Sequence, residues 1–217
     1  MRNGDTDFGV TMQYPSAVLI RVFDERHDRF QGFGPNSDQA LTVDESWHQD
    51  VTATLGKARR LDAGGYEERM LCYTSARPGD DTVVLFTLPR CPDECKRVAE
   101  IQVRAQKRDV RVLDKCSATP GVHAGIATQS GLKLGLTRAQ VQAILGPPQA
   151  TRGDKWLYAA SVSVALSKEE ATRRGYPQLE NKPGPGYSPE PSFDKFIVVW
   201  FKADQVSAFR VNMDWGL

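Results

Sequence analysis

The chain has 217 residues, of which 40% are hydrophobic and 25% charged, a composition that suits a globular protein of one domain or two small ones. Lysine and arginine (28) nearly balance aspartate and glutamate (27), so the net charge of +1 provides no extended positive field and argues against a nucleic-acid-binding protein. Every apolar run falls short of the roughly 18 residues that a membrane helix requires, and we therefore predict no transmembrane segment.

The first 35 residues are predicted to be an N-terminal extension with one strand, at 16–23 (SAVLIRVF), which would extend the first sheet. His27 follows in the segment DERHDRF, where three acidic neighbours could raise the pKa of its imidazole or add ligands to a metal site. A solvated charged loop explains the same residues, and we favour it. Residues 32–39 (GFGPNSDQ) are expected to be the loop that leads into the first helix.

A first helix is predicted to begin near Thr42, because Thr42 and Glu45 have the spacing of a capping box, and to stop at Gly56. Its apolar side chains repeat at every fourth position, at Val43, Trp47, Val51 and Leu55. The strands that follow a polar gap are expected at 66–74, 82–88 and 96–105, the last two as a hairpin.

Four cysteines bear on the cellular compartment. Cys91 and Cys95 flank three residues at the tip of the predicted hairpin, where facing residues lie close to disulfide distance. This pairing leaves Cys72 and Cys116 as a second pair by elimination. Free thiols and a zinc site are the alternatives, but no histidine lies near this uncommon spacing. We favour two disulfides, and hence a periplasmic or secreted protein whose signal peptide has been removed.

The second half of the chain has the clearest local signals. Thr137 and Gln140 form a capping box that opens a helix at 138–145, and Gly146 followed by two prolines ends it. The strands of this half are expected at 156–166, 195–201 and 205–213.

The two halves repeat one order of elements: a helix, a polar gap and three strands. Leu55–Gly56 and Leu145–Gly146 end the two helices about 90 residues apart. Tyr66 and Trp156 each follow their own glycine by ten residues. This self-similarity predicts a tandem repeat.

We therefore predict an α+β protein of two tandem units, 36–115 and 116–217, each a short helical segment packed on a small antiparallel sheet, after the extension 1–35. A sheet of this kind buries one face under its helix and leaves the other open. Two open faces side by side would suit the gripping of another molecule.

The segment GLKLGLTRAQVQAILGPPQ, followed by WLY, VVWF and VSAFRVN, resembles the SmpA/OmlA (BamE-like) domain. The resemblance covers 132–211 and is degenerate over 42–105, where Leu55–Gly56 lacks the following proline. The same small fold occurs in tandem in the β-lactamase inhibitor protein family, whose sheet clasps its target enzyme. The resemblance implies a binding protein of the bacterial envelope or secreted space: an inhibitor or immunity-type protein, or an accessory scaffold subunit in outer-membrane protein assembly.

Alternation along the last two strands predicts which side chains a partner would touch. With Phe201 facing the helix, Trp200 and Arg210 would lie on the open face, and both are residue types enriched among binding hot spots. Trp156 and Tyr158 share a face, and they either join Trp200 there or pack under the helix.

A proline-rich insertion at 167–193 separates two strands of the second unit. Its prolines alternate with aromatic residues, which predicts a stiff recognition loop that presents Tyr187. A mobile insertion without a role is the alternative.

The sequence contains no nucleophile elbow, phosphate-binding loop, dinucleotide fingerprint or His-Glu-x-x-His pair. The two remaining histidines, His48 and His123, are expected at a helix edge and in a loop. We expect a non-catalytic protein without cofactor or metal, whose partner is another protein: a hydrolase, a toxin or an envelope assembly component. A small hydrolase with an unrecognised site is the alternative, because catalytic carboxylates can be far apart in sequence.

Overall fold

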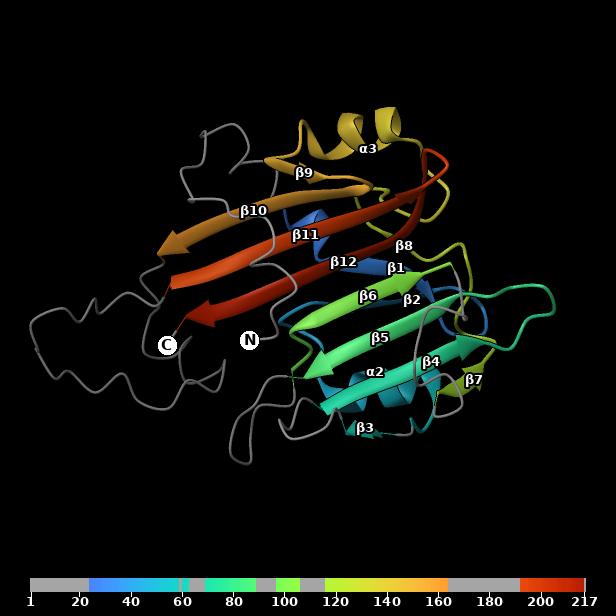
Figure 1. The fold of residues 1–217 in the computed structure, drawn as a ribbon. Coiled ribbons are helices and arrows are strands. Elements are labelled where there is room, and N and C mark those ends of the chain that lie inside the picture. Colours follow the sequence, from blue (N-terminus) through green and yellow to red (C-terminus); the bar gives the residue numbers. More distant parts are fainter. Residues whose placement is uncertain are drawn as a thin grey trace, which may run out of the picture.

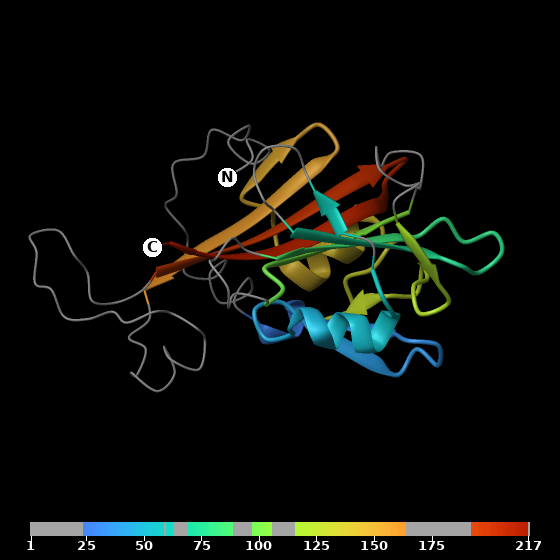
Figure 2. The same cartoon turned by 90° about the horizontal axis from the view of Figure 1, so that it is seen from below.

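In the described part of the computed structural model, a large sheet is covered on one face by two short helices and a small sheet (Figures 1 and 2). The structure describes residues 24–58, 60–62, 69–88, 97–105, 116–163 and 192–216. In the first half its elements are η2 (Glu25–His27), β1 (Arg29–Phe33), β2 (Gln39–Thr42), α2 (His48–Leu55), β3 (Arg60–Asp62), β4 (Arg69–Ser75), β5 (Val83–Leu88) and β6 (Glu100–Arg104). In the second half they are β7 (Ser117–Thr119), β8 (Ala127–Thr128), α3 (Arg138–Leu145), β9 (Ala150–Arg152), β10 (Lys155–Ser163), β11 (Ser192–Lys202) and β12 (Gln205–Gly216).

The strands of both halves form one continuous sheet, in the order β3-β4-β5-β6-β12-β11-β10-β9, with β7 pairing in parallel to β4. The halves join where β6 pairs antiparallel with β12, placing Ile101 opposite Val211. In each half, the final strand of the chain segment (β6 or β12) lies at the junction. The short strand that follows the helix (β3 or β9) lies at the outer edge of the sheet. From the helix onwards, each half has a helix, a short strand and three longer strands, and these strands of both halves belong to one sheet (Figure 1).

The helix α3 forms where the sequence predicts it. The backbone N–H of Thr137 donates to Gln140 Oε1 at 2.9 Å, and the N–H of Gln140 donates back to Thr137 Oγ1 at 3.3 Å. The helix ends at Gly146, which has φ of 82°. Because a side chain is disfavoured at this positive φ, glycine at this position ends the helix at little cost.

The helix α2 begins at His48, so the prediction of a helix from Thr42 is wrong. Thr42 is the last residue of β2 and pairs with β1. The first turn of α2 is closed instead by the carboxylate of Asp50, which accepts the N–H of Trp47 at 2.7 Å. Strand pairing therefore overrides the local capping signal at Thr42. The helix begins instead after Trp47, whose N–H is accepted by the carboxylate three residues later.

A small sheet with the order β2-β1-β8 lies on the same side of the large sheet as the helices (Figure 2). The loop predicted at 32–39 is present at 34–38, but it connects β1 and β2 in a hairpin and does not lead into the first helix. Phe30 and Phe33 are fully buried, Phe30 stacking on Phe209 with ring centroids 5.8 Å apart and Phe33 contacting Phe86 at 5.9 Å. The small sheet therefore packs across the junction, because Phe209 belongs to the second half and Phe86 to the first.

One hydrogen bond recurs in both halves. The hydroxyl of Tyr73 donates to the carbonyl of Gly56 at 2.8 Å, and that of Tyr158 donates to the carbonyl of Gly146 at 3.2 Å. Each bond ties a long strand to the end of the helix before it. This bond aligns Tyr73 with Tyr158, whereas the sequence prediction aligned Tyr66, which lies outside the described residues, with Trp156.

Three predicted features lie outside the described residues: the strand at 16–23, the Cys91–Cys95 pair, and the insertion at 167–193 with Tyr187, apart from its last two residues.

Candidate binding face

Strand alternation divides the large sheet into a face covered by the helices and the small sheet, and a face turned away from them, called the outer face below (Figure 2). Val199 and Phe209 point to the covered face and belong to the main core. Their neighbours Val198 and Arg210 lie opposite each other on the outer face. Among the described elements, no helix and no second sheet packs on the outer face.

Trp200 lies partly exposed on the outer face, between two cationic side chains. The ammonium of Lys155 is 6.0 Å from the centre of its indole, and the guanidinium of Arg210 is 5.8 Å from it. A β-bulge changes the register directly after Trp200, so that Trp200 pairs with Ala208 while Phe201 pairs with Val206. Bulges re-aim side chains and are frequent beside functional sites. The indole is thus held by cation–π contacts with part of its surface in solvent.

Arg210 is held in place by Glu100, which is itself hydrogen-bonded to Asn212. Its guanidinium lies 3.4 Å from a carboxylate oxygen of Glu100, and the amide of Asn212 donates to the same oxygen at 3.4 Å. The side chains of Arg210 and Glu100 are 18% and 15% exposed. Arg210 therefore contacts the indole of Trp200 while part of its side chain stays exposed.

Apolar side chains continue the outer face beside Trp200. Leu157, Ala159 and Val198 form a buried cluster, and Phe196 and Trp200 pack against it while staying partly exposed. An aromatic anchor beside a dry apolar cluster with charged side chains around it has the composition of a protein-binding surface.

A disulfide joins Cys72 and Cys116, as predicted from the sequence, with the Cα atoms 4.7 Å apart. Cys72 lies opposite Leu85 in the neighbouring strand, on the outer face, and is fully buried. Val83 and Leu85 complete a small apolar cluster around the bond. The disulfide therefore secures the segment at Cys116 on the outer face of the first half, and Trp200 lies on that of the second half.

Of the two alternatives for Trp156 and Tyr158, the structure shows packing on the helix side of the sheet, and the alternative that they join Trp200 on the outer face is wrong. In the antiparallel register Trp156 lies opposite Val199, and Tyr158 lies opposite Ile197, both of which point to the core. Tyr158 is fully buried, and Trp156 packs edge-on against Phe201 at 4.8 Å. Lys155 takes the position opposite Trp200, and the sequence analysis missed it because the register between two strands leaves no signal in either strand alone.

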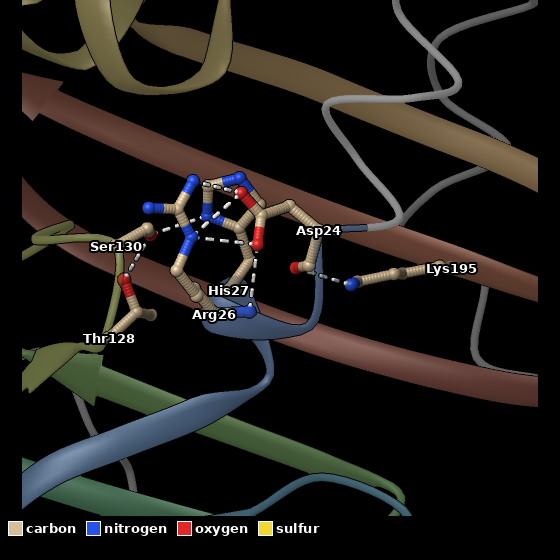
Figure 3. Close-up of polar contacts among 6 residues, drawn as sticks. All are labelled: Asp24, Arg26, His27, Thr128, Ser130 and Lys195. Atoms are coloured by element: carbon tan, nitrogen blue, oxygen red, sulfur yellow. Dashed lines mark hydrogen bonds and ion pairs between the residues drawn. The ribbon is translucent and has the colours of Figure 1, made fainter.

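A buried polar cluster lies between η2 and β11, on the covered side of the large sheet (Figure 3). Lys195 is fully buried, and its ammonium lies 2.6 Å from the carboxylate of Asp28, which is 7% exposed. His27 is also buried, and its Nδ1 is hydrogen-bonded to the hydroxyl of Ser130, which contacts Thr128. The expected solvated loop around His27 is therefore wrong: these groups fasten η2 to the sheet and to the turn after β8.

Burial sets the ionisation of the Asp28–Lys195 pair. It raises the pKa of Asp28 to about 6, although the ammonium of Lys195 partly opposes this shift, and nearby Glu25 and Asp44 add to it. Burial likewise lowers the pKa of Lys195, and Asp28 partly opposes that change. Both groups are buried, so a substrate could not reach the lysine. The pair holds the segment after η2 against β11.

His123 lies in the loop between β7 and β8 and contacts the hydroxyl of Ser37. The N–H of Gly125 donates to Nδ1 of His123 at 3.0 Å, so the neutral ring carries its proton on Nε2. This Nε2 therefore donates to Ser37 Oγ, 2.8 Å away, and cannot accept the hydroxyl proton. A serine in this arrangement is not activated as a nucleophile.

Comparison of the chain with protein-family models, curated proteins and solved structures gave no match. In the part of the chain that the structure describes, no helix has the length and apolarity to cross a membrane. Nor do the described residues bring together three or more histidine, cysteine, aspartate or glutamate side chains in a group that could hold a metal ion.

Proposed function

We propose that the protein is a non-catalytic binding module that grips a partner protein on the outer face of its sheet, with Trp200 as the central contact. The observation that carries the proposal is the partly exposed indole between Lys155 and Arg210, beside the cluster around Val198. Tryptophan and arginine are the residue types that contribute most to protein interfaces, and their pre-ordering by cation–π contacts lowers the entropy lost on binding.

The polar clusters support binding rather than catalysis. Lys195 and His27 are buried beneath the covered face, and the ring of His123 donates to Ser37 instead of accepting from it. Each of these groups therefore has a structural role that accounts for its position.

The disulfide supports a place outside the cytoplasm, in the periplasm or the secreted space, because such bonds persist in oxidising compartments. In that setting the resemblance to tandem BamE-like domains favours an inhibitor or immunity-type protein that covers a hydrolase or a toxin. The fused sheet fits this version, since the outer faces of both halves lie on one surface. A scaffold subunit for outer-membrane protein assembly is the second candidate, and it rests on the resemblance alone.

Site-specific photo-crosslinking tests both the binding and its location. A benzophenone amino acid would replace Phe196, which is partly exposed on the outer face, and in a control would replace Trp47, which is partly exposed at the start of α2. Both variants would be irradiated in envelope and secreted fractions of the source organism. We expect one dominant adduct from position 196, absent from position 47. A hydrolase or toxin in that adduct supports the inhibitor, and barrel-assembly proteins support the scaffold; equal adducts from both positions would contradict the proposal.

A further inference from the structure

One row of side chains crosses the outer face from β9 to β6, and it combines positive charge with the tryptophan. Each residue of the row pairs with the next one on the neighbouring strand. Across five strands the order is Arg152, Lys155, Trp200, Ala208 and Arg104. This set is called the cationic row below. It holds three cationic side chains, one aromatic and one small residue, and no acidic one.

Three acidic side chains near this row are paired with arginines outside it. Asp154 and Asp204 lie in the turns at the same end of the sheet, and both bind Arg138 of α3, at 2.7 and 3.1 Å. Arg138 stacks on Phe201, on the covered face, so it draws the two carboxylates to the helix side. Glu100 on the outer face is paired with Arg210, two rows away from the cationic row. The row itself therefore combines three cationic side chains with no acidic residue.

We propose that the cationic row receives an extended acidic segment of the partner protein, running across the strands. This inference rests on the proposed function and names the chemistry of its partner. Arg104 and Arg152 make further contacts within the chain. We expect Lys155 to contribute most to binding of the acidic segment, because it lies between Arg152 and the indole of Trp200.

The spacing of the strands fixes the pattern that the segment must have. Neighbouring strands lie about 4.8 Å apart, so the three strand spacings from Lys155 to Arg104 amount to roughly 14 Å. An extended segment advances about 3.4 Å per residue, so acidic residues about four positions apart would reach both cations. A residue between them would lie over Trp200 and the small side chain of Ala208, where an aromatic ring can stack on the indole.

A protein segment fits this row better than a nucleic acid. The row directly beside it contains a single cation, Arg210, which is paired with Glu100, and the rows beyond contain Glu100 and Asp194. A phosphate backbone needs a longer track of positive charge, and the net charge of +1 does not supply it.

The test uses defined probes and the full chain. Fluorescent peptides of one length would carry two glutamates four positions apart around a phenylalanine, or two glutamines in their place, and a thymidine oligonucleotide would serve as the nucleic-acid probe. We expect the glutamate peptide to bind at least tenfold more tightly than the glutamine peptide at low salt, with affinity falling several-fold as salt rises. Lys155→Glu should weaken binding at least tenfold, whereas Lys133→Glu, the same change at an exposed lysine before α3, should leave it unaltered.

Melting temperatures of both variants would show that they are folded, and Lys155→Gln provides a milder change at the same position. Equal affinity for the two peptides would overturn the inference, and so would tighter binding of the oligonucleotide or equal effects at positions 155 and 133. Those results would leave the proposed function standing, because crosslinking at position 196 does not depend on the charge of the partner. Absence of an outer-face adduct, in contrast, would remove the proposed function whatever the peptides do.

Discussion

Removal of the Cys72–Cys116 disulfide is expected to cost a large part of the stability of the fold. The bond links residues 44 positions apart, and a closed loop of this length restricts the unfolded chain by about 4 kcal/mol. A domain of this size is stable by about 5–15 kcal/mol, so the loss is a substantial share. With a change of about 2–4 °C per kcal/mol, the midpoint of thermal unfolding should fall by roughly 8–16 °C.

The assay is urea and thermal unfolding of the wild type and of the double variant Cys72→Ala, Cys116→Ala. Both should keep the far-ultraviolet circular dichroism of a strand-rich protein, because the disulfide acts mainly on the unfolded chain. Treatment with a reductant should bring the wild type down towards the double variant. A double variant that unfolds within about 1 kcal/mol of the wild type would refute the reasoning, and would mean that the segment at Cys116 is held by packing alone.

Three further predictions concern the core, the buried ion pair and a helix cap. Phe30→Ala should lower the free energy of unfolding by about 3–5 kcal/mol, measured in urea, because it leaves a cavity against Phe209; a loss below 1 kcal/mol would contradict the packing described. The pKa of Asp28 is raised in the folded state to about 6 from 3.8, so its contribution to stability is complete below pH 3.8 and is lost as the pH rises through 6. Unfolding free energies between pH 4 and 7.5 should show this decline in the wild type and a smaller one in Asp28→Asn, and equal slopes would exclude Asp28 as its source. Thr137→Ala should destabilise the protein by about 1 kcal/mol through loss of the cap of α3, whereas Thr151→Ala, at an exposed position in β9, should be close to neutral.

The elements with self-contained signals were predictable from the sequence. The helix α3 is bounded by a capping box and a glycine followed by prolines, all within a dozen residues of one another, and β11 and β12 are strongly apolar strands joined by a short turn. The direction of Trp200 followed from alternation with Phe201.

The features that depend on distant pairing were not predictable. The face of Trp156 is set by its register against Val199 in β11, which no local pattern specifies. Thr42 carries a good capping signal, yet the hairpin with β1 uses it as a strand residue. The junction of β6 with β12 and the contact of Lys195 with Asp28 connect residues more than 100 positions apart, so only the folded chain brings them together.

Trp200 is the central residue of the proposed binding surface, and one binding measurement tests its role. The protein crosslinked through position 196 would be purified and titrated with the wild type, Trp200→Ala and Trp47→Ala. Trp47 is a matched control, because it is also partly exposed and has an arginine, Arg97, stacked 5.2 Å from its ring. We predict that Trp200→Ala raises the Kd about 30-fold or more, which corresponds to the loss of about 2 kcal/mol that is typical of an interface hot spot. Trp47→Ala should change the Kd less than about threefold. Equal effects of the two substitutions, or a Kd that Trp200→Ala leaves unchanged, would contradict the assignment of the outer face as the binding surface.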